Sequence, residues 1–115
     1  MPPPHSVEAA VDPEEAFVAA ISSCHMLWFL SIAAKKGFVV DDYRDEAVGI
    51  MGRNGNGKVS VVTVHLRPVV SFSGTQQPTN AELTALHHEA HETCYIANSI
   101  TTEVICEPVS VETPR

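Results

Sequence analysis

Two cysteines, Cys24 and Cys94, each lie in a segment whose sequence favours a helix. Taken separately, each thiol could simply be buried and pack as a small hydrophobic side chain. If the two predicted helices bring the Cα atoms to within about 4.4–6.8 Å, however, the pair can form a disulfide. In the cytosol a pair of cysteines is more often catalytic or metal-binding than structural, so this pair suggests thiol redox chemistry.

A second group of residues suits a metal ion. His87, His91 and Cys94 occur at positions i, i+4 and i+7 and share one face of the second predicted helix. Imidazole and thiolate ligands together favour zinc. The spacing differs from His-Glu-x-x-His, however, and a solvated polar face explains the histidines equally well. The metal site is therefore kept as an alternative, and we expect no metal or cofactor. Cys106, on the last predicted strand, is expected to be structural.

The first predicted helix positions Cys24. It should begin after Asp12, a good N-cap that is followed by proline and two glutamates, and end at residue 36 before Gly37. Ile21 and Trp28 lie on the same helix face as Cys24 and could form an apolar wall for a substrate, although core packing is the more ordinary role for both.

The residue after Cys24 is a histidine, His25. Successive residues point about 100° apart around a helix, so we do not expect His25 to be the partner of the Cys24 thiolate.

The remaining elements are mostly strands. Asn and Gly tolerate positive φ, so residues 54–57 (Asn-Gly-Asn-Gly) predict a hairpin turn. Alternation in the second arm places Val62, Val64 and Leu66 on one face, and Val61 with Thr63 on the other. Residues 1–11 read as a flexible arm and residues 12–115 as a single domain. Grouped helices and antiparallel strands predict an α+β fold, with strands at 38–40, 46–52, 58–72 and 101–111 and a second helix from residue 79 or 80 to about 98.

Composition excludes several classes of partner. The chain has 14 acidic and 7 basic residues and a net charge of −7, which disfavours nucleic acid and anionic membranes. Residues 17–34 carry no charge and just reach the length of a membrane span, but they include several polar side chains, so a core helix is the better interpretation. No signal peptide is visible, and we expect a cytoplasmic protein.

Residues 13–36 and 86–108 resemble the two helical cysteine motifs of the OsmC/Ohr family, which comprises thiol peroxidases that reduce organic hydroperoxides. In that family a Pro-Glu pair opens the central helix and the peroxidatic cysteine follows ten residues after the glutamate, as Pro13-Glu14 and Cys24 do here. The family's resolving cysteine lies near the end of a later helix and matches Cys94. The resemblance covers residues 12–110 and implies an OsmC-like fold, with two main helices packed on an antiparallel sheet and the Cys24 helix at its centre.

The resemblance also implies roles. Cys24 would attack the peroxide and become a sulfenic acid, Cys94 would condense with it, and an external dithiol would reduce the disulfide. Glu14 would be the carboxylate that orients an arginine. Ten residues of unbroken helix span about 15 Å, so Glu14 could serve Cys24 only if the helix is broken or if Glu14 comes from a second subunit. Family members form intertwined dimers, so we expect a homodimer.

The sequence departs from the family at its N-terminus. Relatives carry a β-meander there, with an arginine that holds the peroxidatic sulfur as thiolate, whereas residues 1–11 contain no arginine. The arginines present do not match that motif: Arg44, Arg53, Arg67 and Arg115. The chain could be a shortened member, a member completed by another chain, or a noncatalytic binding or structural relative. For the chain acting alone we expect weak peroxidase activity that rises with pH.

Overall fold

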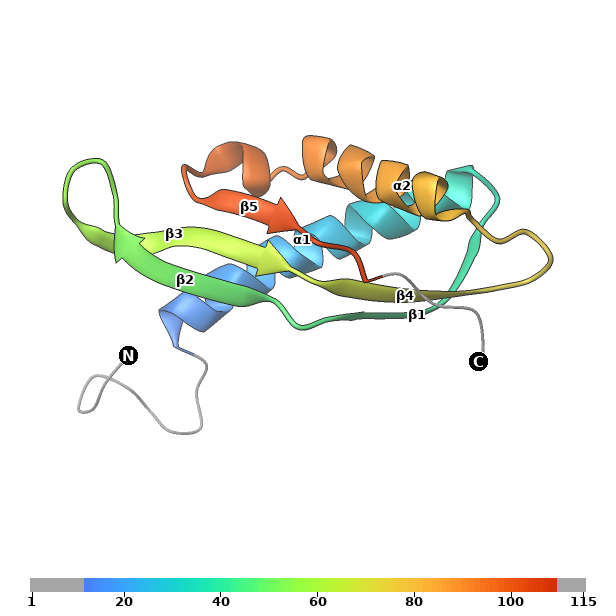
Figure 1. Ribbon diagram of the computed structural model, residues 1–115, viewed down its shortest axis with the longest axis horizontal. Coiled ribbons are helices and arrows are strands. Elements are labelled where there is room, and N and C mark those ends of the chain that lie inside the picture. The colour runs from blue at the N-terminus through green and yellow to red at the C-terminus, as the bar shows by residue number, and fades with distance from the viewer. Residues whose placement is uncertain (1–11, 110–115) are drawn as a thin grey trace.

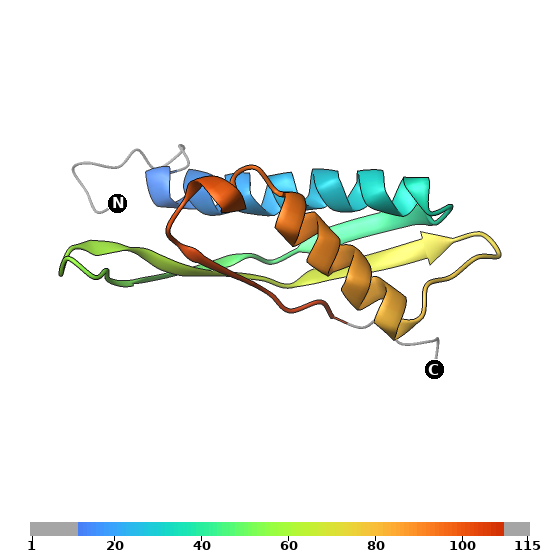
Figure 2. The same ribbon diagram turned by 90° about the horizontal axis from the view of Figure 1, so that it is seen from above.

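The computed structural model describes residues 12–109, so the predicted arm at residues 1–11 and the end of the last predicted strand lie outside the described residues. A long helix runs along an extended ribbon of strands, and a second helix packs obliquely against the first (Figures 1 and 2). The elements follow in the order α1 (Pro13–Lys35), β1 (Val39–Asp45), β2 (Val48–Arg53), β3 (Val59–Leu66), β4 (Pro68–Ser73), α2 (Asn80–Thr93), the 3-10 helix η1 (Ala97–Ser99) and β5 (Glu103–Cys106). This arrangement confirms the predicted α+β class.

Local sequence signals set the limits of α1. The Asp12 side chain accepts a hydrogen bond from the Glu15 backbone N–H at 2.9 Å, and thereby satisfies one of the free donors of the first turn. At the other end Gly37 adopts φ of 84°, a conformation that glycine takes without steric cost. The helix is therefore continuous from Pro13 to Lys35, as predicted.

Two sheets lie side by side along the ribbon. β1 pairs with β4, and β2 pairs with β3, both antiparallel, whereas β5 adds to β3 in parallel. The β2–β3–β5 sheet is therefore mixed rather than wholly antiparallel. The turn between β2 and β3 is the predicted hairpin: Asn54 Oδ1 accepts hydrogen bonds from the N–H groups of Asn56 and Lys58.

The predicted strand at residues 58–72 is wrong in one respect, because the chain changes sheets at Arg67. Proline has no N–H to donate, and Pro68 begins the new strand. The Arg67 N–H leaves the ladder and donates to Asp45 Oδ1 at 2.6 Å. The predicted strand at 38–40 extends to Asp45 because β1 gains β4 as its partner.

A β-bulge changes the predicted strand faces. The register between β2 and β3 shifts between Ile50 and Met51, where Ile50 pairs with Thr63 and Met51 with Val61. One extra residue in β3 reverses the alternation beyond it. Val61 consequently packs against the same core cluster as Val64, although alternation alone placed it on the opposite face.

The second helix is shorter than predicted, because α2 ends at Thr93 rather than near residue 98. Cys94 is the C-cap, and its ψ of 116° turns the chain out of the helix. The Asn98 side-chain amide donates to the carbonyls of Glu92 and Cys94, and the Asn98 backbone N–H also donates to the Cys94 carbonyl. This stop places Cys94 at the corner between α2 and η1.

α1 occupies the centre of the packing. One core cluster surrounds Phe29 between α1, α2 and the β1–β4 sheet, and a second joins Ile21 to Val64 and Leu66 of β3. By length and composition α1 could also cross a membrane, but here it contacts three strands and α2, as the core helix of a soluble fold does.

Candidate functional site

The cysteine pair predicted from the sequence comes together. Cys24 projects from the middle of α1 and is partly exposed, whereas Cys94, at the end of α2, is 1% exposed. Burial raises the pKa of the Cys94 thiol, and so does its side-chain hydrogen bond with Cys24. Both sulfurs are unbridged. The two helices therefore bring the two thiols close enough to interact, with the more accessible sulfur on α1.

The corner after α2 also provides donors to the Cys94 sulfur. The Ala97 backbone N–H donates to Cys94 Sγ at 3.5 Å, and the Ile96 backbone also hydrogen-bonds to this side chain. These N–H groups lower the pKa of the Cys94 thiol and so oppose the larger effect of burial. Backbone donors at this sulfur favour its charged form.

Of the two residues predicted to form an apolar wall, Ile21 is unavailable for it. Ile21 is 0% exposed and belongs to the core with Val64 and Leu66. Trp28 packs against the Phe29 cluster and meets the exposed ring of Tyr95 edge-on, with ring centroids 5.3 Å apart. For Ile21 the core role, which the sequence allowed, is the one observed, because its helix face points onto β3.

A groove of about 590 Å³ lies elsewhere on α1, against β1 and β2. Its mostly apolar walls include Val18, Met26 and Tyr43, and Glu14 stands at one end. α1 is unbroken, so the ten residues from Glu14 to Cys24 span about 15 Å. Glu14 thus lies along the groove and away from the Cys24 of its own chain.

The three arginines within residues 12–109 are engaged with other groups. Arg44 pairs with Asp42 at 3.1 Å, Arg53 donates to the Gly57 carbonyl, and Arg67 lies 3.8 Å from Glu107. The fourth, Arg115, lies outside the described residues.

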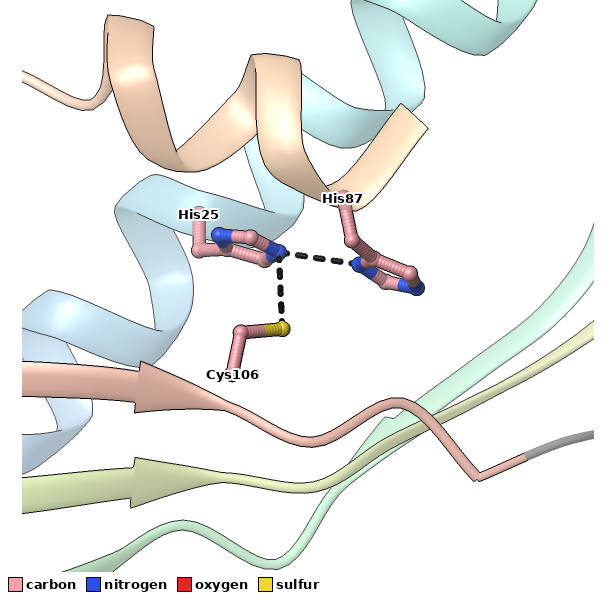
Figure 3. A group of neighbouring side chains, drawn as sticks. All are labelled: His25, His87 and Cys106. Carbon is pink, nitrogen blue, oxygen red and sulfur yellow. Dashed lines mark hydrogen bonds between the residues drawn. The ribbon is translucent and has the colours of Figure 1, made fainter. Parts of the chain in front are cut away.

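A second cluster of side chains lies between α1, α2 and β5. His25 of α1 stacks against His87 of α2, with His25 Nε2 and His87 Nδ1 3.0 Å apart, and Cys106 Sγ of β5 lies 3.7 Å from the same His25 nitrogen (Figure 3). Burial lowers the pKa of His25 to about 4 and that of His87 to about 3, so both rings are neutral at physiological pH. Repulsion between the two rings lowers the pKa of His87 further, and His91 lowers that of His25.

This cluster replaces the metal set considered from the sequence. In the part of the chain that the structure describes, the ligand atoms that converge are those of His25, His87 and Cys106, without His91 or Cys94. Cys94 instead contacts Cys24, and Cys106 contacts His25. The sequence analysis missed this group because its members come from three elements. Two histidines at otherwise apolar core positions were the available signal.

Comparison with known proteins finds both a matching family and similar solved structures. The sequence model of the OsmC-like protein family matches residues 5–108. An OsmC-like protein of unknown function from Vibrio cholerae is 63% identical, with a TM-score of 0.90 over 94% of this chain and 70% of that one. No curated protein matches.

More distant structures share the fold. An organic hydroperoxide resistance protein from Legionella pneumophila is 20% identical, with a TM-score of 0.68 over 87% of this chain and 69% of that one. OhrB of Bacillus subtilis is 17% identical, with a TM-score of 0.68 over 89% and 73%. The family match over most of the sequence and the 63% identical Vibrio relative show that the chain belongs to the OsmC-like protein family.

Proposed function

We propose that the chain is a thiol-dependent peroxidase that reduces organic hydroperoxides through Cys24 and Cys94. The observation that carries the proposal is the proximity of the two thiols, whose side chains interact, with Cys24 partly exposed and Cys94 buried. A peroxide arriving from solvent reaches Cys24 first. Several fold relatives are named organic hydroperoxide resistance proteins, and this chain has the paired thiols that such chemistry needs.

The reaction balances with these two residues and one external reductant. The Cys24 thiolate attacks the distal peroxide oxygen, the O–O bond breaks, and the alkoxide takes a proton and leaves as an alcohol. Cys24 is then a sulfenic acid, and attack by the Cys94 sulfur forms the disulfide and releases water. An external dithiol returns both cysteines to thiols by exchange.

The first test is intact-mass analysis of the reduced protein before and after one equivalent of an organic hydroperoxide. We expect the loss of two hydrogens, and peptide mapping should locate a Cys24–Cys94 disulfide. In Cys94→Ser the expected product is instead a single added oxygen on Cys24, because the resolving thiol is gone. Unchanged mass, with both thiols still titratable, would favour a noncatalytic OsmC-like binding protein.

We further propose that the chain acts as a homodimer. Apolar side chains of β2 are exposed beside the groove: Val48 is 40%, Ile50 44% and Met51 52% exposed. Leu27, on α1, is 61% exposed. Apolar surface of this kind is normally covered by a partner, and a second copy would also bring another Glu14 to the assembly.

Sedimentation velocity at micromolar concentration measures the oligomeric state directly. We expect a dimer for the wild-type chain and a shift toward monomer for Ile50→Glu, because a carboxylate at this position would be desolvated in the interface. Glu46→Gln, at an exposed residue between β1 and β2, is the control. A wild-type monomer would contradict this proposal.

A further inference from the structure

Three ligand-type side chains from distant parts of the sequence converge inside the molecule (Figure 3). His25 comes from α1, His87 from α2 and Cys106 from β5, and their nearest ligand atoms all lie within 4.8 Å of one another. The two histidines are 1% and 2% exposed, and Cys106 is half-buried. Because each element contributes one ligand, the cluster occupies the point where both helices meet the β2–β3–β5 sheet.

Two of the three separations between these atoms are close to those of a tetrahedral metal centre. Bonds of about 2.0–2.1 Å to nitrogen and 2.3 Å to sulfur place two nitrogens about 3.3 Å apart, and nitrogen and sulfur about 3.6 Å apart. The corresponding separations are 3.0 Å between His25 Nε2 and His87 Nδ1, and 3.7 Å between Cys106 Sγ and His25 Nε2. The third separation, between the ligand nitrogen of His87 and Cys106 Sγ, is within 4.8 Å, so the side chains would have to rotate to place all three atoms around one ion.

Hydrogen bonding alone satisfies this pair of rings poorly. Two neutral imidazoles have two N–H donors and two acceptors, and their mutual bond uses one of each. His25 Nδ1 and His87 Nε2 have no hydrogen-bond partner among the described residues. These two nitrogens are not the ones that would bind an ion, so they stay unpaired with or without a metal. The two nitrogens that would bind it have one hydrogen bond between them.

The surrounding charge favours a cation. Glu107 directly follows Cys106 in the sequence, and Asp45 accepts a hydrogen bond from Ser22 Oγ of α1, three residues before His25. A bound cation would be attracted by both carboxylates and would replace the thiol proton, which leaves to solvent as the thiolate forms its bond to the metal.

We propose that His25, His87 and Cys106 form a transition-metal site of the His2Cys type, suited to Zn²⁺. Two imidazoles and one thiolate are the borderline-soft ligands that this ion prefers, and its tetrahedral coordination leaves a fourth position for water or another small ligand. An ion bound here joins α1, α2 and β5, so binding also stabilises the fold.

This site is separate from the proposed peroxidase pair, since its sulfur is Cys106 rather than Cys24 or Cys94. Failure of one proposal therefore leaves the other standing.

The test uses the full chain, reduced and freed of metal with a chelator that is then removed. Co²⁺ serves as the spectroscopic probe and Zn²⁺ as the competitor. We expect one equivalent of Co²⁺ to produce the visible absorption of a tetrahedral centre together with a thiolate-to-metal charge-transfer band, and one equivalent of Zn²⁺ to abolish both. Zn²⁺ should also protect Cys106, located by peptide mapping, from alkylation.

Variants identify the ligands. Loss of a residue that merely orients a ligand already weakens metal binding about 10–100-fold, so Cys106→Ser should weaken it by about 100-fold or more and remove the charge-transfer band. Cys94→Ser is the matched cysteine control and His88→Gln, at an exposed position on α2, the matched histidine control; both should keep the band. Circular dichroism verifies that each variant folds, and the alkylation measurement on the unaltered chain does not depend on any variant.

Two results would overturn the proposal. One is the absence of both a Co²⁺ spectrum and Zn²⁺ protection of Cys106 at micromolar metal. The other is loss of the charge-transfer band in Cys94→Ser with retention in Cys106→Ser, which would assign the thiolate ligand to Cys94.

Discussion

Replacing Cys24 with serine is expected to lower the rate of organic hydroperoxide reduction at least about 1,000-fold, because loss of a covalent nucleophile removes the main chemical step. A serine hydroxyl is a weak nucleophile at neutral pH, and no other thiol combines an exposed position with contact to Cys94. The measurement is peroxide consumption in the presence of excess dithiol. Thermal melting confirms that the variant is folded.

Two further variants separate the roles of the residues on the helices. Cys94→Ser should consume one equivalent of peroxide without dithiol and then stop, since the sulfenic acid on Cys24 forms but has no partner. Ser31→Ala, at an exposed position two turns after Cys24 on α1, should retain the wild-type rate. If Cys24→Ser kept the rate and Cys94→Ser lost it, the two cysteines would have exchanged roles.

Acidification is expected to destabilise the metal-free protein by several kcal/mol between pH 7 and about pH 4.5. Both buried rings have a folded-state pKa far below the unfolded value of about 6.5, with burial as the main cause. In this window the unfolded chain binds protons that the folded chain does not, so the free energy of unfolding falls as pH falls. Each histidine contributes roughly 1 kcal/mol per pH unit, and a whole domain has only about 5–15 kcal/mol.

The charged and titratable groups around His25 all enter this prediction. His91 and His87 oppose its protonation, Asp45 favours it, and the Cys106 thiol is neutral. Because burial outweighs the Asp45 carboxylate, the net effect is the loss of stability at low pH.

Urea unfolding at several pH values, with chelator present, tests this expectation. His87→Gln should reduce the slope of stability against pH by about one proton, because a neutral amide replaces one buried imidazole. His88→Gln, at the exposed neighbouring position, should leave the slope unchanged. An unchanged slope in His87→Gln would contradict the assignment of the acid sensitivity to the buried pair.

The sequence could predict features that depend on short-range chemistry. Asp12 caps the first helix, Gly37 ends it, and Asn54 closes the hairpin turn, in each case through contacts within four residues or the φ of a single residue. The family motifs similarly pointed to Cys24 and Cys94 as a pair, and the structure brings the two side chains close enough to interact.

Long-range packing decided the features that the sequence analysis did not predict. The parallel pairing of β5, the bulge opposite Met51 and the change of sheet at Arg67 all depend on partners from distant parts of the chain. Strand alternation has a period of two and gives no warning of a bulge, so Val61 was assigned to the wrong face.

Dependence on long-range packing also explains why the sequence did not predict the histidine cluster. α1 is apolar nearly all round, so its sequence does not show which face will be buried. The fold buries the face that carries Ile21, His25 and Phe29 and leaves Leu27 exposed. His25 therefore meets His87, 62 positions away, and Cys106, 81 positions away. The sequence by itself determined the helices, the hairpin and the candidate cysteine pair, whereas only the tertiary structure selected the buried face of α1 and assembled a cluster from side chains that share no local pattern.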